Sequence, residues 1–196
     1  MRRLVFGGSF NPIHHGHLLC SRAVAEKGGF DRITLIPSAQ PPHKPASATL
    51  ADPADRLAMV RLAVDGDPLY EVDDLELHRP GPSYTLDTLR NLTSRGSDRA
   101  NWLIGADMLL YLPNWHRPLD LLNEANFIVM ARPGWSLDWA ALPPEYRHLQ
   151  ANVVEAPLIA ITSTEVRDRI RAGLPIRYLT PDSVCRYIHD RGLYRC

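Results

Sequence analysis

Short apolar runs alternate with amphipathic stretches along this chain, and this alternation limits the folds that it can adopt. The runs RRLVFGG and DRITLIP precede HGHLLCSRAVAEKG and DPADRLAMVRLAVDG, which have helical periodicity. Strand, helix and strand in succession form the repeating unit of a parallel sheet that helices cover on both faces. The sequence therefore predicts an α/β fold, and its 196 residues predict a single domain over residues 1–196.

The middle of the chain continues the same alternation. We expect a strand near residues 70–77 and then a helix in SYTLDTLRNLTSRG, with Leu86, Leu89 and Leu92 on one face. ANWLIGAD and ANFIVMARPG are typical of two further buried strands, and NVVEAPLI of a late one. Short helical turns or a surface excursion are expected between residues 135 and 149.

Residues 162–196 are expected to form a C-terminal helical portion with two short helices, TSTEVRDRIRAG and TPDSVCRYIHDRG. Thr162 and Glu165 have the spacing of a capping box at the first helix. Thr180 or Asp182 is expected to cap the second.

Charge and cysteine content exclude several classes of protein. The chain has 22 Lys plus Arg and 22 Asp plus Glu, so no general attraction to nucleic acid or anionic lipid is expected. Cys20, Cys185 and Cys196 are far apart, which fits a reducing cytoplasm better than a disulfide framework. No membrane span or secretory signal is recognisable. We expect a cytoplasmic protein without membrane or nucleic-acid partners; whether it forms a homo-oligomer stays open.

The segment GGSFNPIHHGH follows the first strand and opens the first helix. Gly7 and Gly8 let an anion approach the backbone, and the helix start offers N–H groups and a favourable dipole, so His14 and His17 are candidates for phosphate binding. Each histidine alone is more often a surface or core residue. A zinc site of His14, His15 and His17 has no Cys, Asp or Glu nearby to complete it, and no metal-binding residues are predicted.

A second phosphate-binding pattern is present in ITSTEVRDRI. Ser163 and Thr164 stand at a helix start and Arg167 lies one turn further, which suits the outer phosphates of a triphosphate. The plain alternative is a capped surface helix.

Three other segments carry candidate ligand contacts. Each follows a predicted strand, and ligands of such sheets bind beyond the carboxyl ends of the strands. PSAQPPHK brings Lys44, and GPSYTLDTL presents Tyr84 and Thr85 at a helix start. IGADMLLYLPNWH presents Asp107 and Trp115. Trp115 is either a core residue or a plate on which a flat ring stacks.

These segments together resemble a known family. His14-His15-Gly16-His17 resembles the H-x-G-H signature of the nucleotidyltransferase superfamily, and TSTEVR in ITSTEVRDRI resembles the S-[ST]-T-x-[IV]-R pattern of adenylyltransferases. With PPHK, SYT, GAD and ARPG, the chain resembles bacterial nicotinate mononucleotide adenylyltransferases from Val5 to the segment YLTPDSVCRYIHDRGLY. The resemblance implies a Rossmann-like, doubly wound sheet.

The resemblance also implies an activity: adenylyl transfer from ATP to nicotinate mononucleotide, which gives deamido-NAD (nicotinate adenine dinucleotide) and pyrophosphate in NAD biosynthesis. Mg²⁺ would arrive with ATP. The implied catalytic residues are His14, His17 and Arg167. The implied ATP contacts are Gly7, Gly8, Ser9, Phe10, His14, His17, Lys44, Gly105, Asp107, Ser163, Thr164 and Arg167. The implied mononucleotide contacts are Tyr84, Thr85, Asp107, Trp115 and Arg132.

The chain departs from the family pattern at two positions, because the first motif more often reads G-G-T-F-D-P and here contains Ser9 and Asn11. Neither change is expected to abolish activity. The alternatives are another acceptor, either nicotinamide mononucleotide or phosphopantetheine, and a non-catalytic nucleotide sensor.

Overall fold

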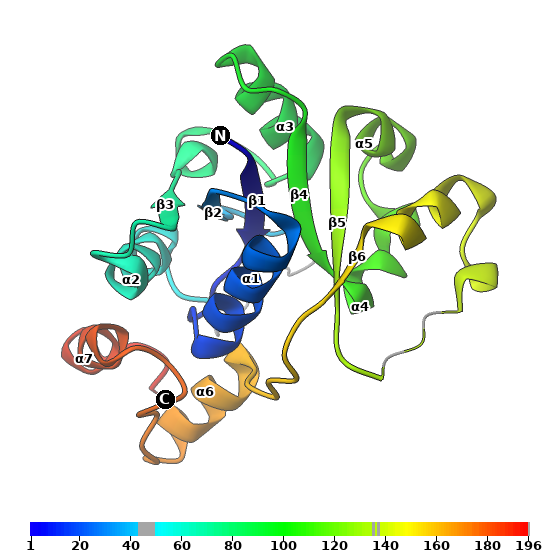
Figure 1. The fold of residues 1–196 in the computed structure, drawn as a ribbon. Coiled ribbons are helices and arrows are strands. Elements are labelled where there is room, and N and C mark those ends of the chain that lie inside the picture. Colours follow the sequence, from blue (N-terminus) through cyan, green and yellow to red (C-terminus); the bar gives the residue numbers. More distant parts are fainter. Residues whose placement is uncertain (43–49, 135, 137, 196) are drawn as a thin grey trace.

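The computed structural model describes residues 1–42, 50–134, 136 and 138–195 (Figure 1). Six strands form one sheet in the order β3-β2-β1-β4-β5-β6, and every neighbouring pair is parallel. The strands are β1 (Arg3–Gly8), β2 (Arg32–Pro37), β3 (Tyr70–Val72), β4 (Ala100–Gly105), β5 (Ala125–Ala131) and β6 (Val153–Glu155). The predicted α/β class with a parallel sheet is confirmed.

The strand order reverses between β1 and β4. From β1 the chain builds outward through β2 to β3, and it then returns to the other side of β1 and continues through β5 to β6. The crevice beyond the carboxyl ends of the strands at such a reversal is where open α/β sheets bind ligands. Gly8 ends β1 and Gly105 ends β4 at this edge.

Helices cover both faces of the sheet. On one face lie α1 (His15–Gly28) and α2 (Pro53–Val64), and α7 (Asp182–Asp190) packs against α2. On the other face lie α3 (Thr85–Ser94), α4 (Ala106–Leu109) and α5 (Pro118–Glu124). Helix α6 (Ser163–Arg171) lies near the start of α1, below the strands in Figure 1. Within the described ranges, no helix is both long and apolar enough to cross a membrane.

Alternate residues of the strands supply two hydrophobic cores. Leu4, Ile33 and Leu35 are buried in the cluster under α1 and α2, whereas Val5 and Trp102 are buried in the cluster under α3 and α5. Because the central strands are covered on both faces, their apolar runs are nearly continuous.

Two predicted strands are shorter in the structure, and one helix was not predicted. The strand near residues 70–77 stops at Val72, because Asp73 accepts the Leu75 N–H in a turn (2.9 Å) and a 3₁₀ helix follows at Leu75–His78. Likewise β6 covers only Val153–Glu155 of its predicted run. Helix α5 was not predicted; Pro118 occupies its first position.

The remaining short helices are 3₁₀ helices. The predicted turns between residues 135 and 149 correspond to Trp139–Ala141 and Pro144–Asn152, and a further one covers Leu112–Asn114.

The two predicted caps of the C-terminal helices have different outcomes. The Thr162 Oγ1 accepts the Glu165 N–H (3.1 Å), so the predicted cap of α6 is confirmed. The predicted cap of α7 is wrong: the buried Thr180 donates its hydroxyl to the Ile13 carbonyl (2.8 Å), and Asp182 is already the first helical residue. Thr180 thus uses its hydroxyl in a long-range hydrogen bond and does not cap the helix.

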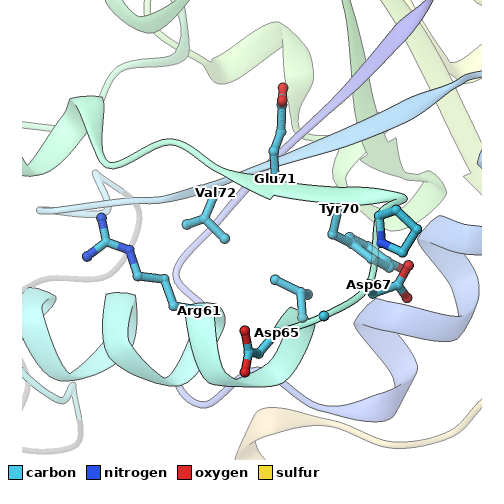
Figure 2. A pocket seen from close by; sticks show the side chains of 9 residues that line it. Arg61, Asp65, Asp67, Tyr70, Glu71 and Val72 are labelled. Carbon is cyan, nitrogen blue, oxygen red and sulfur yellow. The ribbon is translucent and has the colours of Figure 1, made fainter.

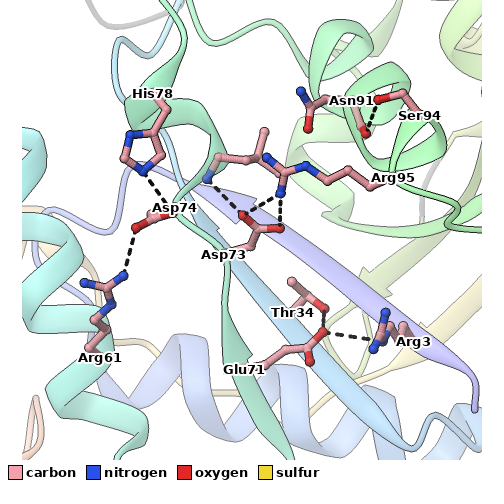
Figure 3. Close-up of polar contacts among 11 residues, drawn as sticks. Arg3, Thr34, Arg61, Glu71, Asp73, Asp74, His78, Asn91, Ser94 and Arg95 are labelled. Carbon is pink, nitrogen blue, oxygen red and sulfur yellow. Dashed lines mark hydrogen bonds and ion pairs between the residues drawn. The ribbon is translucent and has the colours of Figure 1, made fainter.

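Charged side chains surround the β3 edge of the sheet. Arg61 pairs with Asp74 (2.8 Å) and Arg95 with Asp73 (3.2 Å), as Figure 3 shows. An open pocket of about 480 Å³ lies between α2 and β3, lined in part by Asp65 (Figure 2). The loop at residues 65–68 precedes β3 and therefore lies at the amino edge of the sheet, away from the edge where ligands are expected.

Candidate active site

The loop between β1 and α1 presents two histidine rings at the carboxyl edge of the sheet. His14 is the N-cap residue of α1 and His17 lies in the first turn. Their rings stack with centroids 3.6 Å apart and an angle of 25° between the planes. The spacing in the signature thus brings two imidazoles to one place at a helix start.

His17 is held in one orientation by several contacts. Its Nδ1 accepts the His14 backbone N–H (3.2 Å), and its ring meets the Phe10 ring edge-on at 5.2 Å and the Phe6 ring at 6.1 Å. Because Nδ1 is an acceptor, the neutral ring carries its proton on Nε2. The site therefore holds an imidazole donor in a fixed direction.

Gly16 is required by this arrangement. A Cβ at position 16 would lie 3.0 Å from both Cε1 and Nδ1 of His14 and 3.3 Å from the Ile161 carbonyl oxygen. Any larger residue would require the His14 ring and the segment that leads to α6 to shift by a few tenths of an ångström. The glycine of H-x-G-H thus makes room for the first histidine.

His14 is buried, with 5% of its surface exposed. Burial, with a smaller effect from nearby His15, lowers the pKa of His14 from 6.5 to about 4. The ring is therefore neutral at pH 7 in the ligand-free protein, and a bound polyanion would favour its protonation.

This lowered pKa predicts a loss of stability in acid. Between pH 6.5 and 4 the unfolded chain protonates His14 whereas the folded chain does not, so stability present above pH 6.5 falls as the pH decreases. The contribution is roughly 3 kcal/mol. Denaturant unfolding across this window should show a shallower decline for His14→Gln than for the wild type. Equal declines in the two proteins would contradict the assignment.

The second phosphate-binding pattern meets the first in space. The Ser163 hydroxyl donates to the Pro12 carbonyl (2.8 Å) across 151 positions of sequence, and Arg167 donates to the Asn11 carbonyl (2.8 Å). Arg167 also donates to the Thr164 hydroxyl (3.3 Å). Because the Ser163 hydroxyl donates a hydrogen bond to the Pro12 carbonyl, it fixes the loop.

Two polar atoms at this junction are left without partners inside the described part of the chain. They are Nδ1 of His14 and Nε of Arg167, both buried. A buried polar atom without a partner costs free energy, and such atoms are a mark of ligand sites. Burial lowers the pKa of Arg167, and nearby Arg171 lowers it further. An anion bound between the two signatures would relieve both penalties.

A second group of predicted residues lies at the start of α3. The Gln40 N–H donates to the Ser83 hydroxyl (3.1 Å) and the Ser83 N–H donates to the Gln40 carbonyl (2.8 Å), which joins the loop after β2 to this helix start. Tyr84 stacks on His116, with centroids 4.2 Å apart and 21° between planes. Trp115, next to His116, packs partly against the core.

The other predicted residues are spread along the same edge. Asp107 is exposed after β4, and a Cβ on Gly105 would lie 2.4 Å from its Oδ1, so the glycine leaves room for this carboxylate. Arg132 is exposed directly after the end of β5. Thr85 begins α3. Lys44 lies outside the described residues.

Within the same described ranges, no group of three or more His, Cys, Asp or Glu side chains has the arrangement of a metal site.

Comparisons with known proteins agree with this geometry. The cytidylyltransferase-like family profile matches residues 5–169. A probable nicotinate-nucleotide adenylyltransferase of Roseiflexus sp. (strain RS-1) is 41% identical over 193 residues, which cover 97% of this chain and 96% of the relative. A probable nicotinate-nucleotide adenylyltransferase of Geobacillus thermodenitrificans (strain NG80-2) is also 41% identical, over 191 residues that cover 97% of this chain and 84% of the relative. The chain belongs to the nicotinate-nucleotide adenylyltransferase family.

Solved structures related to this family share the fold. Plasmodium falciparum nicotinic acid mononucleotide adenylyltransferase complexed with NaAD matches with a TM-score of 0.76 and 19% identity, over 99% of this chain and 98% of that one. The same enzyme complexed with APC matches with a TM-score of 0.73 and 18% identity, over 98% and 96%. The Rossmann-like fold that the resemblance implied is confirmed.

Three residues that lie at or behind the site were not predicted from the sequence. His116 adjoins the predicted Trp115. Arg56 is wholly buried and donates to backbone carbonyls of two site loops. Tyr194 donates to Asn11. A signal existed for Arg56, because positions 56, 60 and 64 share one face of α2 and the other two are apolar. Nothing local marks Tyr194.

Proposed function

We propose that this chain catalyses adenylyl transfer from ATP to nicotinate mononucleotide, in a site built from the loop before α1 and the start of α6. The supporting observation is that Arg167 donates to the Asn11 carbonyl in the loop that leads to His14, and that His14 and Arg167 each keep a buried polar atom without a partner in the described chain. Polar groups of this kind, at two helix starts, suit a triphosphate.

The reaction needs no covalent intermediate. An oxygen of the acceptor's 5′-phosphate attacks the α-phosphorus of ATP and forms a new P–O bond. The bond from the α-phosphorus to the bridging oxygen breaks, and pyrophosphate leaves with that bond's electrons. The nucleophile is already an anion, so the protein's task is to align two repelling phosphates and stabilise the charge on the leaving group.

In this proposal, His17 donates from Nε2 to an oxygen at the reacting phosphorus, and Arg167 holds the leaving pyrophosphate. The closely stacked His14 binds the triphosphate beside His17. Gly7 and Gly8 leave the backbone accessible, and Ser163 fixes the loop on which the histidines stand. Lys44, from the loop after β2, is proposed to join the triphosphate contacts.

Mg²⁺ would be bound mainly by triphosphate oxygens and would offset part of their charge. The exposed carboxylate of Asp107, at the end of β4, is proposed to contact a nucleotide ribose or a water molecule of the Mg²⁺ ion.

The acceptor is proposed to bind near the start of α3. Trp115 would stack the pyridine ring, and Tyr84 and Thr85 would contact its carboxylate. The stacked pair of Tyr84 and His116 gives this region an aromatic wall. Arg132 is proposed for the acceptor phosphate.

The function is tested by pyrophosphate release with ATP, Mg²⁺ and each of three acceptors: nicotinate mononucleotide, nicotinamide mononucleotide and phosphopantetheine. We expect the highest kcat/KM with nicotinate mononucleotide. A higher value with either other acceptor would replace the proposed substrate. Absence of release with all three, while ATP still binds, would instead indicate a nucleotide sensor.

A further inference from the structure

Asn11, one of the two departures from the family motif, has a side chain that binds distant segments of the chain. It is buried, with 4% of its surface exposed. Its Oδ1 accepts the Ala51 N–H (3.0 Å) and the Tyr194 hydroxyl (2.8 Å), and its carbonyl accepts Arg167 (2.8 Å). Asn11 therefore joins the loop to the segment before α2, to the C-terminal tail and to α6.

Tyr194 reaches this junction from the tail that follows α7. Its backbone adopts a left-handed conformation with φ of 64°, which is unfavourable for a residue with a Cβ. The turn carries the side chain inward, where burial raises the pKa of the phenol although Arg56 and Arg167 oppose the shift. Tyr194 is thus a neutral hydroxyl donor close to two guanidinium groups.

Both of those guanidinium groups also hold the loop. Arg56 donates to the Ser9 carbonyl (2.8 Å), and Arg167 donates to the next carbonyl but one, that of Asn11. Ser163 then holds the Pro12 carbonyl. The loop is thus held at three backbone carbonyls, those of Ser9, Asn11 and Pro12, and Tyr194 binds the side chain of the middle residue.

We propose that Tyr194 is a positioning residue for ATP, whose hydroxyl fixes Asn11 and thereby the placement of the two histidines relative to Arg167. This inference rests on the proposed function. Displacement of a reacting group by about 1 Å can cost a factor of 10² in rate, so one hydrogen bond at this junction is expected to affect catalysis more than folding.

The experiment removes only the hydroxyl, in Tyr194→Phe. We expect kcat/KM for ATP to fall about tenfold, the loss of one hydrogen bond at a buried acceptor, and KM for nicotinate mononucleotide to stay within about twofold. The Kd for ATP without acceptor, measured by calorimetry, should rise. This readout separates failure of the inference from failure of the proposed function, which would appear as a wild type that releases no pyrophosphate.

Tyr187→Phe is the matched control. The Tyr187 hydroxyl donates to Asp55 (2.8 Å) and fastens α7 to α2 without contacting Asn11. If the hydroxyls act only through stability, the two variants should lose similar unfolding free energy and keep similar kinetics. We expect only Tyr194→Phe to change the parameters for ATP.

Substitutions at Asn11 test whether Tyr194 acts through the Asn11 side chain. Asn11→Asp keeps an acceptor, so Tyr194→Phe should still cost about tenfold in that background. Asn11→Leu removes the acceptor, and the further loss from Tyr194→Phe should then be under about twofold. An undiminished loss in the Leu background, or Tyr194→Phe with wild-type kcat/KM and Kd for ATP, would overturn the proposal.

Discussion

Replacing His17 with alanine is expected to lower kcat by roughly two to four decades, the range for removal of one strong catalytic contact. The structure gives the reason: the ring is stacked on His14, meets two phenylalanines, and accepts the His14 N–H on Nδ1, so its other nitrogen donates in a fixed direction. Interactions that strengthen as charge develops act mainly on kcat. Steady-state kinetics with saturating acceptor measures the change.

The matched control for this prediction is His15→Ala. His15 precedes Gly16 in the same signature, and its structural contact is a backbone N–H to the Leu179 carbonyl (2.9 Å), which alanine retains. We expect kcat of this variant to stay within about threefold of the wild type, because no reacting group is removed. A His17→Ala enzyme as active as the His15→Ala enzyme would exclude His17 from the mechanism.

Replacing Arg56 with leucine is expected to lower the free energy of unfolding by roughly 3–5 kcal/mol. The Arg56 side chain is 0% exposed and donates to four backbone carbonyls. These belong to Ser9, Ser38, Ala39 and Ala51. Leucine fills part of the volume but donates no hydrogen bond, so these carbonyls lose their partner. Chemical denaturation monitored by circular dichroism gives the measurement.

Arg61→Leu on the same helix provides the comparison. Arg61 is half-exposed and pairs with Asp74 on the surface (Figure 3), and such pairs contribute about 0–1 kcal/mol. We expect its unfolding free energy to change by less than about 1 kcal/mol. If Arg56→Leu is no less stable than Arg61→Leu, the buried arginine does not hold the two loops.

Local sequence patterns were sufficient to predict the sheet and the two helix starts at which phosphate binding is proposed. The apolar runs that became β1, β2, β4 and β5 are buried on both faces, so few alternatives fit them. The helix starts at His15 and Ser163 carry their signals within a few residues: a histidine pair around a glycine, and a Thr162 cap. These features depend on neighbours in sequence, which is why they could be predicted.

Contacts between distant segments could not be predicted in the same way. Thr180 looks like a cap, but it bonds Ile13 across 167 positions. Asn11 stands inside the first motif, and its side chain binds Tyr194 across 183 positions. In both cases the partner of a polar side chain lies far away in the sequence, so only the packed structure reveals it.

The most direct test of adenylyl transfer follows the α-phosphate of ATP. ATP labelled at the α-phosphorus is incubated with the enzyme, Mg²⁺ and nicotinate mononucleotide, and the products are separated. Attack on the α-phosphorus predicts that the label enters the dinucleotide and that the released pyrophosphate is unlabelled. Label found in AMP alone, or retained in ATP while the enzyme is shown to be folded and to bind ATP, would contradict the proposed reaction.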